Sequence, residues 1–129
     1  IEAVKADAQK DNEVVFINLV ETDSNYGHRR DPEGFAKALE AIDERMPEII
    51  DNMKDGDYLF ISADHGCDPC AVGSDHTREY VPILFYNKKL EAKNLGTRES
   101  FADIGATILD RFDITTDELD IQGKSLVME

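Results

Sequence analysis

The fold is decided by residues 31–53, DPEGFAKALEAIDERMPEIIDNM, which lie between two short apolar runs. Asp31 is a suitable N-cap residue and Pro32 suits the first helical position, so a helix is expected to begin here. Apolar residues then recur at three- and four-residue steps, which places them on one face of the helix. They are Phe35, Ala38, Leu39, Ile42, Met46, Ile49, Ile50 and Met53. This pattern predicts a helix that packs on a sheet.

The apolar runs on either side of this helix have the composition of strands. Residues 14–20, VVFINLV, and residues 58–62, YLFIS, are rich in β-branched and aromatic side chains. Because strand, helix and strand follow one another, we predict a βαβ unit with a parallel pair. A third strand is expected at residues 81–86, and a last amphipathic helix at residues 98–112 with Thr97 as its cap. The expected fold class is α/β, with a mostly parallel sheet flanked by helices.

The composition suits a single domain over residues 1–129, because 41% of the 129 residues are hydrophobic. Fourteen Lys and Arg against 28 Asp and Glu give a net charge of -14, which repels nucleic acid and anionic lipid. No apolar stretch approaches the roughly 20 residues that span a bilayer, and no signal-peptide pattern opens the sequence. Cys67 and Cys70 are too close to close a useful loop, so a reducing, cytoplasmic location is expected.

The three histidines of the chain each lie near an aspartate in a predicted loop. The pairs are Asp23 with His28, Asp64 with His65, and Asp75 with His76. The first two pairs follow the carboxyl ends of the first two predicted strands, where open α/β sheets bind their ligands. Mixed carboxylate and imidazole donors suit a divalent ion such as Mn²⁺ or Zn²⁺. The pattern therefore predicts a metal site.

The candidate metal ligands are Asp23, His28, Asp64, His65 and His76. A catalytic site that keeps an open position uses about three protein ligands, so five ligands indicate two ions about 4 Å apart, with some ligands missing. Two metal ions at this separation commonly act on phosphoryl groups. Two divalent cations would also allow so acidic a protein to bind an anionic phosphate ester.

Other polar motifs are interpreted as structural. Cys67 and Cys70 form a Cys-x-x-Cys pattern without the second pair of a zinc ribbon or the following helix of a thioredoxin motif. Arg29 and Arg30 could contact a phosphate, but ion pairing near Asp31 and Glu33 at the solvated entry to the helix explains them at least as well, so both are left out of the site. Ser74 and Thr77 flank the Asp75–His76 pair and could act as nucleophiles, but hydroxyls in such a polar loop are expected to cap turns.

Four motifs, taken in order, resemble the phosphopentomutases of the alkaline phosphatase superfamily. They are TDSNYGHRRD at residues 22–31, ADHGCDP at residues 63–69, DHTREYVP at residues 75–82 and LGTRESFADIG at residues 95–105. The Asp-His-Gly element is common to the superfamily, and the other elements narrow the resemblance to this family. The similarity extends over most of residues 13–126.

The resemblance implies an alkaline-phosphatase-like core and a two-manganese enzyme of nucleoside salvage. Such an enzyme interconverts ribose 1-phosphate and ribose 5-phosphate, or the deoxyribose pair. By the same motifs, Asp23, His28 and His76 would hold one Mn²⁺, and Asp64 and His65 would hold the other. The family's phosphorylated threonine nucleophile, a further aspartate ligand and the cap domain lie in an N-terminal part. The chain thus resembles the C-terminal portion of the core, which needs that N-terminal half as its partner and is expected to be inactive alone.

Other functions stay open at this point. A different metalloenzyme of the superfamily, such as a cofactor-independent phosphoglycerate mutase or a phosphatase, would share the Asp-His-Gly element. A stand-alone two-metal hydrolase with water as its nucleophile, or a non-catalytic acidic metal-binding module, would fit a protein of this length.

Overall fold

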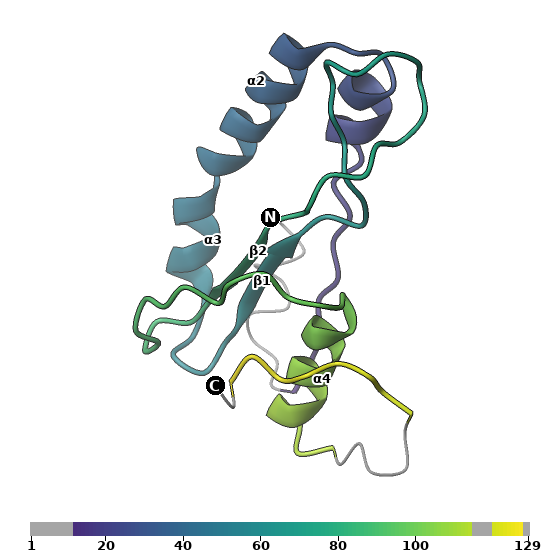
Figure 1. Cartoon of the computed structure of the whole chain (residues 1–129). Coiled ribbons are helices and arrows are strands. Elements are labelled where there is room, and N and C mark those ends of the chain that lie inside the picture. Colours follow the sequence, from purple (N-terminus) through teal and green to yellow (C-terminus); the bar gives the residue numbers. More distant parts are fainter. Residues whose placement is uncertain (1–11, 115–119, 128–129) are drawn as a thin grey trace. The chain divides into compact units, whose positions relative to one another are not determined.

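The computed structural model describes residues 12–114 and 120–127. The chain forms two compact units, Ile1–Lys88 and Lys89–Glu129. Figure 1 shows their elements. The first unit contains the short π-helix η1 (Thr22–Gly27), the helices α2 (Pro32–Asp43) and α3 (Met46–Asn52), and the strands β1 (Leu59–Ser62) and β2 (Ile83–Tyr86). The second contains the helix α4 (Ala102–Arg111). A single domain over residues 1–129 stays a prediction, and part of that range lies outside the described residues.

The predicted start of the long helix is confirmed. The Asp31 carboxylate accepts a hydrogen bond from the Gly34 N–H at 2.9 Å, and Pro32 occupies the first helical position. The apolar face is also found: its members are half-buried or buried, except Leu39, which is 49% exposed. Met53, at the end of this face, is buried.

The helix is nevertheless two helices rather than one, because α2 ends at Asp43 and α3 begins at Met46. Pro47 explains the break. Proline has no N–H to donate to the carbonyl four residues earlier, and its ring clashes with that carbonyl. The Arg45 N–H instead bonds the Ile42 carbonyl at 3.0 Å, which tightens the chain into a turn between the two helices.

The sheet of the described residues consists of β1 and β2, which pair antiparallel. Phe60 faces Phe85 across the ladder, and their rings stack with centroids 4.6 Å apart. Tyr58 adds a second stacked contact to Phe85 at 5.5 Å. Such cross-strand aromatic pairs stabilise a short ladder. The strand predicted at residues 81–86 is therefore present, although its ladder begins at Ile83, after Pro82.

The first predicted strand is wrong, and the parallel βαβ pair is not confirmed. Residues 13–19 form neither helix nor strand, and their side chains are exposed, Phe16 by 89%. Apolar composition favours a strand, but a strand exists only where a neighbouring chain takes up its ladder hydrogen bonds. In this structure, β1 forms its ladder hydrogen bonds with β2 instead.

In the second unit, α4 is shorter than predicted and Thr97 does not cap it. The Ser100 hydroxyl accepts from the Ala102 N–H at 3.1 Å in the place of a cap. Within the helix, Thr107 is fully buried; its hydroxyl donates to the Asp103 carbonyl at 2.6 Å and accepts from the Leu126 N–H at 2.9 Å. Polar contacts thus fasten the end of the chain to α4.

Asp103 is the buried charge of this unit, with 4% of its surface exposed. Burial alone would raise the pKa of its carboxyl, but bonds from the Lys124 N–H and the Arg98 side chain, with the charges of both, lower the pKa overall. The two bonds are 2.9 Å and 2.8 Å long. Asp103 therefore stays ionised and paired.

Among the described residues, no helix has the length and apolar character that crossing a membrane requires.

Candidate metal centre

Of the first two predicted ligands, Asp23 lies in η1, a π-helical turn where the sequence suggested a loop, and His28 is the residue that directly follows it. The His28 N–H bonds the Asp23 carbonyl at 3.0 Å, five residues back along the chain. On an α-helix, residues five apart point about 140° away from each other. The wider π-turn brings them to the same side, and turns of this kind are frequent at functional sites. The local backbone is therefore the reason that Asp23 and His28 meet.

Asp23 contacts two histidines, one through each carboxylate oxygen. Its Oδ2 is 3.4 Å from His28 Nε2, and its Oδ1 is 3.5 Å from His76 Nε2. The two Nε2 atoms are 3.1 Å apart. Ligand atoms that each lie about 2.0–2.2 Å from one ion are spaced about 3.0–3.5 Å from each other. The three side chains therefore have the spacing of donors that share one divalent cation.

The Oδ1 atom of Asp23 adds an independent observation. It is shielded from solvent and has no hydrogen-bond partner among the described residues. A buried carboxylate oxygen without a donor is costly, so an orphan of this kind requires an explanation, such as a bound ion. The donor set fits a cation.

Backbone carbonyls fix the orientation of two of the imidazoles. His28 Nδ1 lies against the Ser74 carbonyl, and His65 Nδ1 lies 3.0 Å from the Gly66 carbonyl. A carbonyl only accepts, so each Nδ1 carries a proton, and in a neutral imidazole Nε2 is then the nitrogen with the lone pair. Metal-ligating histidines are commonly held in this way. In this tautomer, the Nε2 atoms of His28 and His65 are the nitrogens available to a cation.

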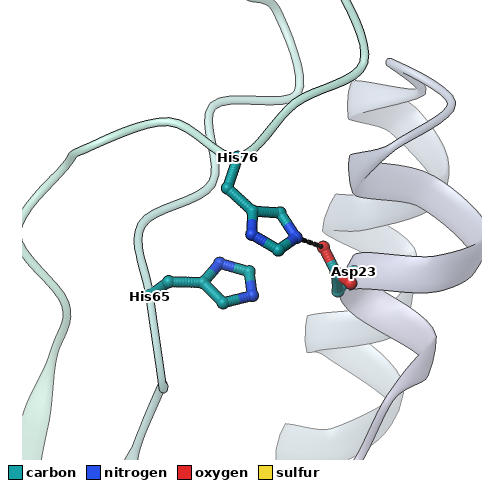
Figure 2. A group of neighbouring side chains, drawn as sticks. All are labelled: Asp23, His65 and His76. Atoms are coloured by element: carbon teal, nitrogen blue, oxygen red, sulfur yellow. Dashed lines mark ion pairs between the residues drawn. The ribbon is translucent and has the colours of Figure 1, made fainter.

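The second predicted pair lies next to the first group. The rings of His65 and His76 stack with centroids 3.7 Å apart, and Asp64 Oδ1 is 3.6 Å from His65 Nε2. Ligand atoms of Asp23, His65 and His76 all lie within 4.8 Å of one another, and Figure 2 shows them facing a common space. The structure thus gathers four predicted ligands, while the Asp64 side chain stays 81% exposed.

The loop that carries His65 and His76 is closed on itself. Gly66 and Thr77 form an isolated bridge, and the Thr77 hydroxyl accepts from the Asp68 N–H at 2.6 Å and donates to Glu79 at 2.5 Å. The Thr77 hydroxyl thus has a structural role, but it joins segments nine residues apart rather than capping a local turn as predicted. A side chain at Gly66 would place its Cβ 2.4 Å from the Glu79 backbone nitrogen, so this closure requires glycine.

Arg30 contacts the loop that carries His76, which the sequence pattern does not predict. Its guanidinium donates to the carbonyls of Gly73, Asp68 and Asp75, the last two at 2.7 Å and 2.5 Å. The predicted ion pair at the helix entry is wrong for this residue, whereas Arg29 is exposed as expected. Sequence patterns do not record bonds to backbone carbonyls, because any residue can supply a carbonyl.

Cys67 lies beside the centre rather than in it. Its Sγ is so close to Gly27 that a Cβ there would approach it to 2.6 Å. Burial raises the pKa of the Cys67 thiol, and the negative charges of Asp23, Glu79 and Asp68 raise it further, against the opposing effect of Arg30. Both Cys67 and Cys70 are free. A raised pKa keeps the Cys67 thiol protonated and weakly nucleophilic at neutral pH.

The chain belongs to the metalloenzyme superfamily, whose sequence profile matches residues 1–116. The relatives that it resembles are phosphopentomutases, so the resemblance seen in the motifs is confirmed. The chain is 54% identical over 108 residues to the phosphopentomutase of Aeromonas salmonicida, which covers 84% of this chain and 26% of the relative. The chain is 58% identical over 99 residues to the phosphopentomutase of Helicobacter pylori (strain HPAG1), which covers 77% of this chain and 24% of the relative. It is 48% identical over 124 residues to the phosphopentomutase of Photorhabdus laumondii, which covers 96% of this chain and 30% of the relative. The chain thus spans about a quarter of the length of these relatives.

Proposed function

We propose that this chain forms part of the metal-binding core of a phosphopentomutase. The reaction is the interconversion of ribose 1-phosphate and ribose 5-phosphate, or of the deoxyribose pair, by phosphoryl transfer. One observation carries the proposal: ligand atoms of Asp23, His65 and His76 converge within 4.8 Å, and the Oδ1 atom of Asp23 is shielded and has no donor among the described residues. The similarity to phosphopentomutases supports the choice of reaction.

In this proposal the ligands divide into two groups. Asp23, His28 and His76 hold one Mn²⁺, because their donor atoms are 3.1–3.5 Å apart. Asp64 and His65 hold the second, together with ligands from outside this chain. Stacking of the His65 ring on the His76 ring, 3.7 Å away, places the two groups side by side. An alkaline-phosphatase-like core with a mostly parallel sheet is part of the same proposal.

The chain's own residues supply orientation and charge. The Nδ1 atoms of His28 and His65 face backbone carbonyls, which in the neutral imidazoles leaves the Nε2 lone pairs available to cations. The carboxylate of Asp23 joins two imidazoles through separate oxygens. When bound, two divalent cations would neutralise the negative charge on the phosphoryl oxygens. This supply of positive charge suits a chain with a net charge of -14.

We further propose that turnover requires the remainder of a longer protein and takes place in the cytoplasm. The phosphopentomutases to which this chain is similar are about three times its length, and the family resemblance assigns the nucleophile to an N-terminal part. The free thiols of Cys67 and Cys70 suit a reducing compartment. The chain by itself is then expected to be inactive on pentose phosphates.

The test is turnover of ribose 1-phosphate by the intact protein that carries this chain, assayed with Mn²⁺. His76→Ala should lower turnover at least about 100-fold, because it removes a ligand rather than one of the outer contacts that cost about 10–100-fold in metal sites. Asp75→Asn is the matched control, because it alters the neighbouring, exposed side chain and should keep near-wild-type turnover. Normal turnover by His76→Ala would contradict the proposal.

Two further results would also contradict it. Conversion of phosphoglycerate but not of pentose phosphate would assign the chain to another metalloenzyme of the superfamily. Phosphatase turnover by the chain alone would favour the stand-alone hydrolase and show that the chain contains its own means of attack on phosphorus.

A further inference from the structure

The side chain of Arg30 is committed to one loop of the backbone. Three of its N–H groups donate to the carbonyls of Asp68, Gly73 and Asp75, which all belong to the segment that leads to His76. Arg30 itself follows the π-turn that carries Asp23. The guanidinium therefore joins the two segments that supply the proposed ligands.

The loop has little regular structure with which to hold a single conformation. Residues 71–75 form bends, and residues 72–76 are exposed. Exposed connecting segments are mobile unless their backbone groups find partners. Here the partners come from the π-turn segment: Arg30 binds the carbonyls of Gly73 and Asp75, and His28 Nδ1 binds the carbonyl of Ser74 between them.

We propose that Arg30 is a positioning residue that sets the His76 imidazole against Asp23 and His28. It acts through the Asp75 carbonyl, which belongs to the peptide group directly before His76. The inference rests on the proposed metal centre and assigns a role to a residue that contacts none of the reacting groups. Arginine suits this role because its planar fork presents five donors in fixed directions, whereas a lysine ammonium is a compact point charge.

The backbone at Arg30 supports this assignment. Arg30 has φ 54°, in the left-handed region where glycine and asparagine are preferred. A side chain of this size is unfavourable there unless it makes contacts that compensate for the strain. The loop carbonyls are such contacts. A role in binding a phosphate is less well supported, because the three bonds engage Nε and both terminal nitrogens.

The test measures Mn²⁺ affinity of the intact protein, from the electron paramagnetic resonance signal of free Mn²⁺. Arg30→Ala should weaken binding about 10–100-fold, the range for loss of outer contacts in metal sites. The visible spectrum of the Co²⁺ form should also change, because His76 is displaced from the cation. Arg29→Ala is the matched control: it removes the same charge from an exposed neighbour and should leave affinity within about threefold.

Two more measurements separate positioning from a general loss of structure. Arg30→Gly suits the left-handed backbone, so its metal-free stability should equal or exceed that of Arg30→Ala, while its Mn²⁺ affinity should stay low. Millimolar guanidinium should partly restore binding to either variant by occupying the vacated carbonyls, whereas tetramethylammonium, which has no N–H donor, should not. Arg30→Lys should bind with intermediate affinity.

The outcomes distinguish this inference from the proposed function. Equal Mn²⁺ affinity for Arg30→Ala and Arg29→Ala, with unchanged Co²⁺ spectra, would overturn the positioning role and leave the metal centre standing. If Arg30→Ala does not fold, wild-type affinity in Arg30→Gly would have the same meaning. Failure of the wild-type protein to bind Mn²⁺, or unchanged binding by His28→Ala, would overturn the metal centre itself and the role of Arg30 with it.

Discussion

Replacement of Asp23 by asparagine should have opposite effects on stability with and without metal. The substitution keeps the shape of the side chain and removes its charge. In the metal-free protein, Asp23 Oδ1 is shielded and has no donor among the described residues, so its negative charge opposes folding. An asparagine amide can donate to the nearby imidazole nitrogens. Metal-free Asp23→Asn should therefore be at least as stable as the wild type.

With Mn²⁺ present, the order of stability should reverse. A cation at 100 times its dissociation constant stabilises the wild-type fold by about 2.7 kcal/mol. Asp23 supplies the negative charge among the three donors of the first proposed site, and it contacts both histidines of that site. If its loss weakens binding about 100-fold, the upper end of the range for supporting contacts, the same Mn²⁺ concentration adds only about 0.4 kcal/mol.

The assay is denaturant unfolding of the intact protein at a fixed Mn²⁺ concentration and after metal removal, with affinities from calorimetric titration. Asp75→Asn is the control, because it removes the same charge from an exposed carboxylate. It should change affinity by no more than about threefold, since exposed charges act through water and are screened by salt. The reasoning is refuted if Asp23→Asn unfolds more easily without metal and still gains the full wild-type increment from Mn²⁺.

Three other predictions follow from local contacts. Gly66→Ala should weaken Mn²⁺ binding at least about tenfold by titration, because its Cβ would lie 2.4 Å from the Glu79 nitrogen and the loop must shift; Gly105→Ala, whose Cβ meets nothing within 4 Å, should leave binding unchanged. Thr107→Val should cost about 1–3 kcal/mol in urea unfolding, since the buried hydroxyl serves two backbone groups; no loss would exclude that role. The pKa of Asp103 is lowered in the folded state. Its stabilising contribution is therefore present above the pKa of the unfolded state and is lost as the pH falls through the pKa of the folded state. Asp103→Asn should therefore reduce the dependence of the unfolding free energy on pH in acid. The same pH dependence in the variant and the wild type would contradict this role of Asp103.

Local signals in the sequence predicted the helices better than the sheet. The N-cap Asp31 and the apolar periodicity of α2 and α3 depend on near neighbours, and both are found. Pro47, which separates the two helices, is also a local signal, although the apolar periodicity alone predicts a single helix. The choice of a strand's partner is different, because it depends on residues far away in the chain. Residues 14–20 have the composition of a strand without a ladder in the described structure.

The candidate site shows the same division. His28, His65 and His76 were identified because histidines are rare in this chain and each follows an aspartate or lies near one. The contacts that orient them were not predictable. The carbonyls that accept from His28, His65 and Arg30 belong to the backbone, and a sequence carries no mark of which carbonyl will be used.

The separation of the first site's ligands along the chain has a consequence during protein synthesis. His28 and His76 are 48 residues apart, although their Nε2 atoms lie 3.1 Å from each other. At about 5–20 residues per second, His76 is added about 2–10 s after His28. A cation that meets the growing chain in that interval finds Asp23 and His28 without their third partner. Loading is therefore expected to wait until the later loop is made, so the finished geometry, rather than the first ion encountered by the nascent chain, selects the metal.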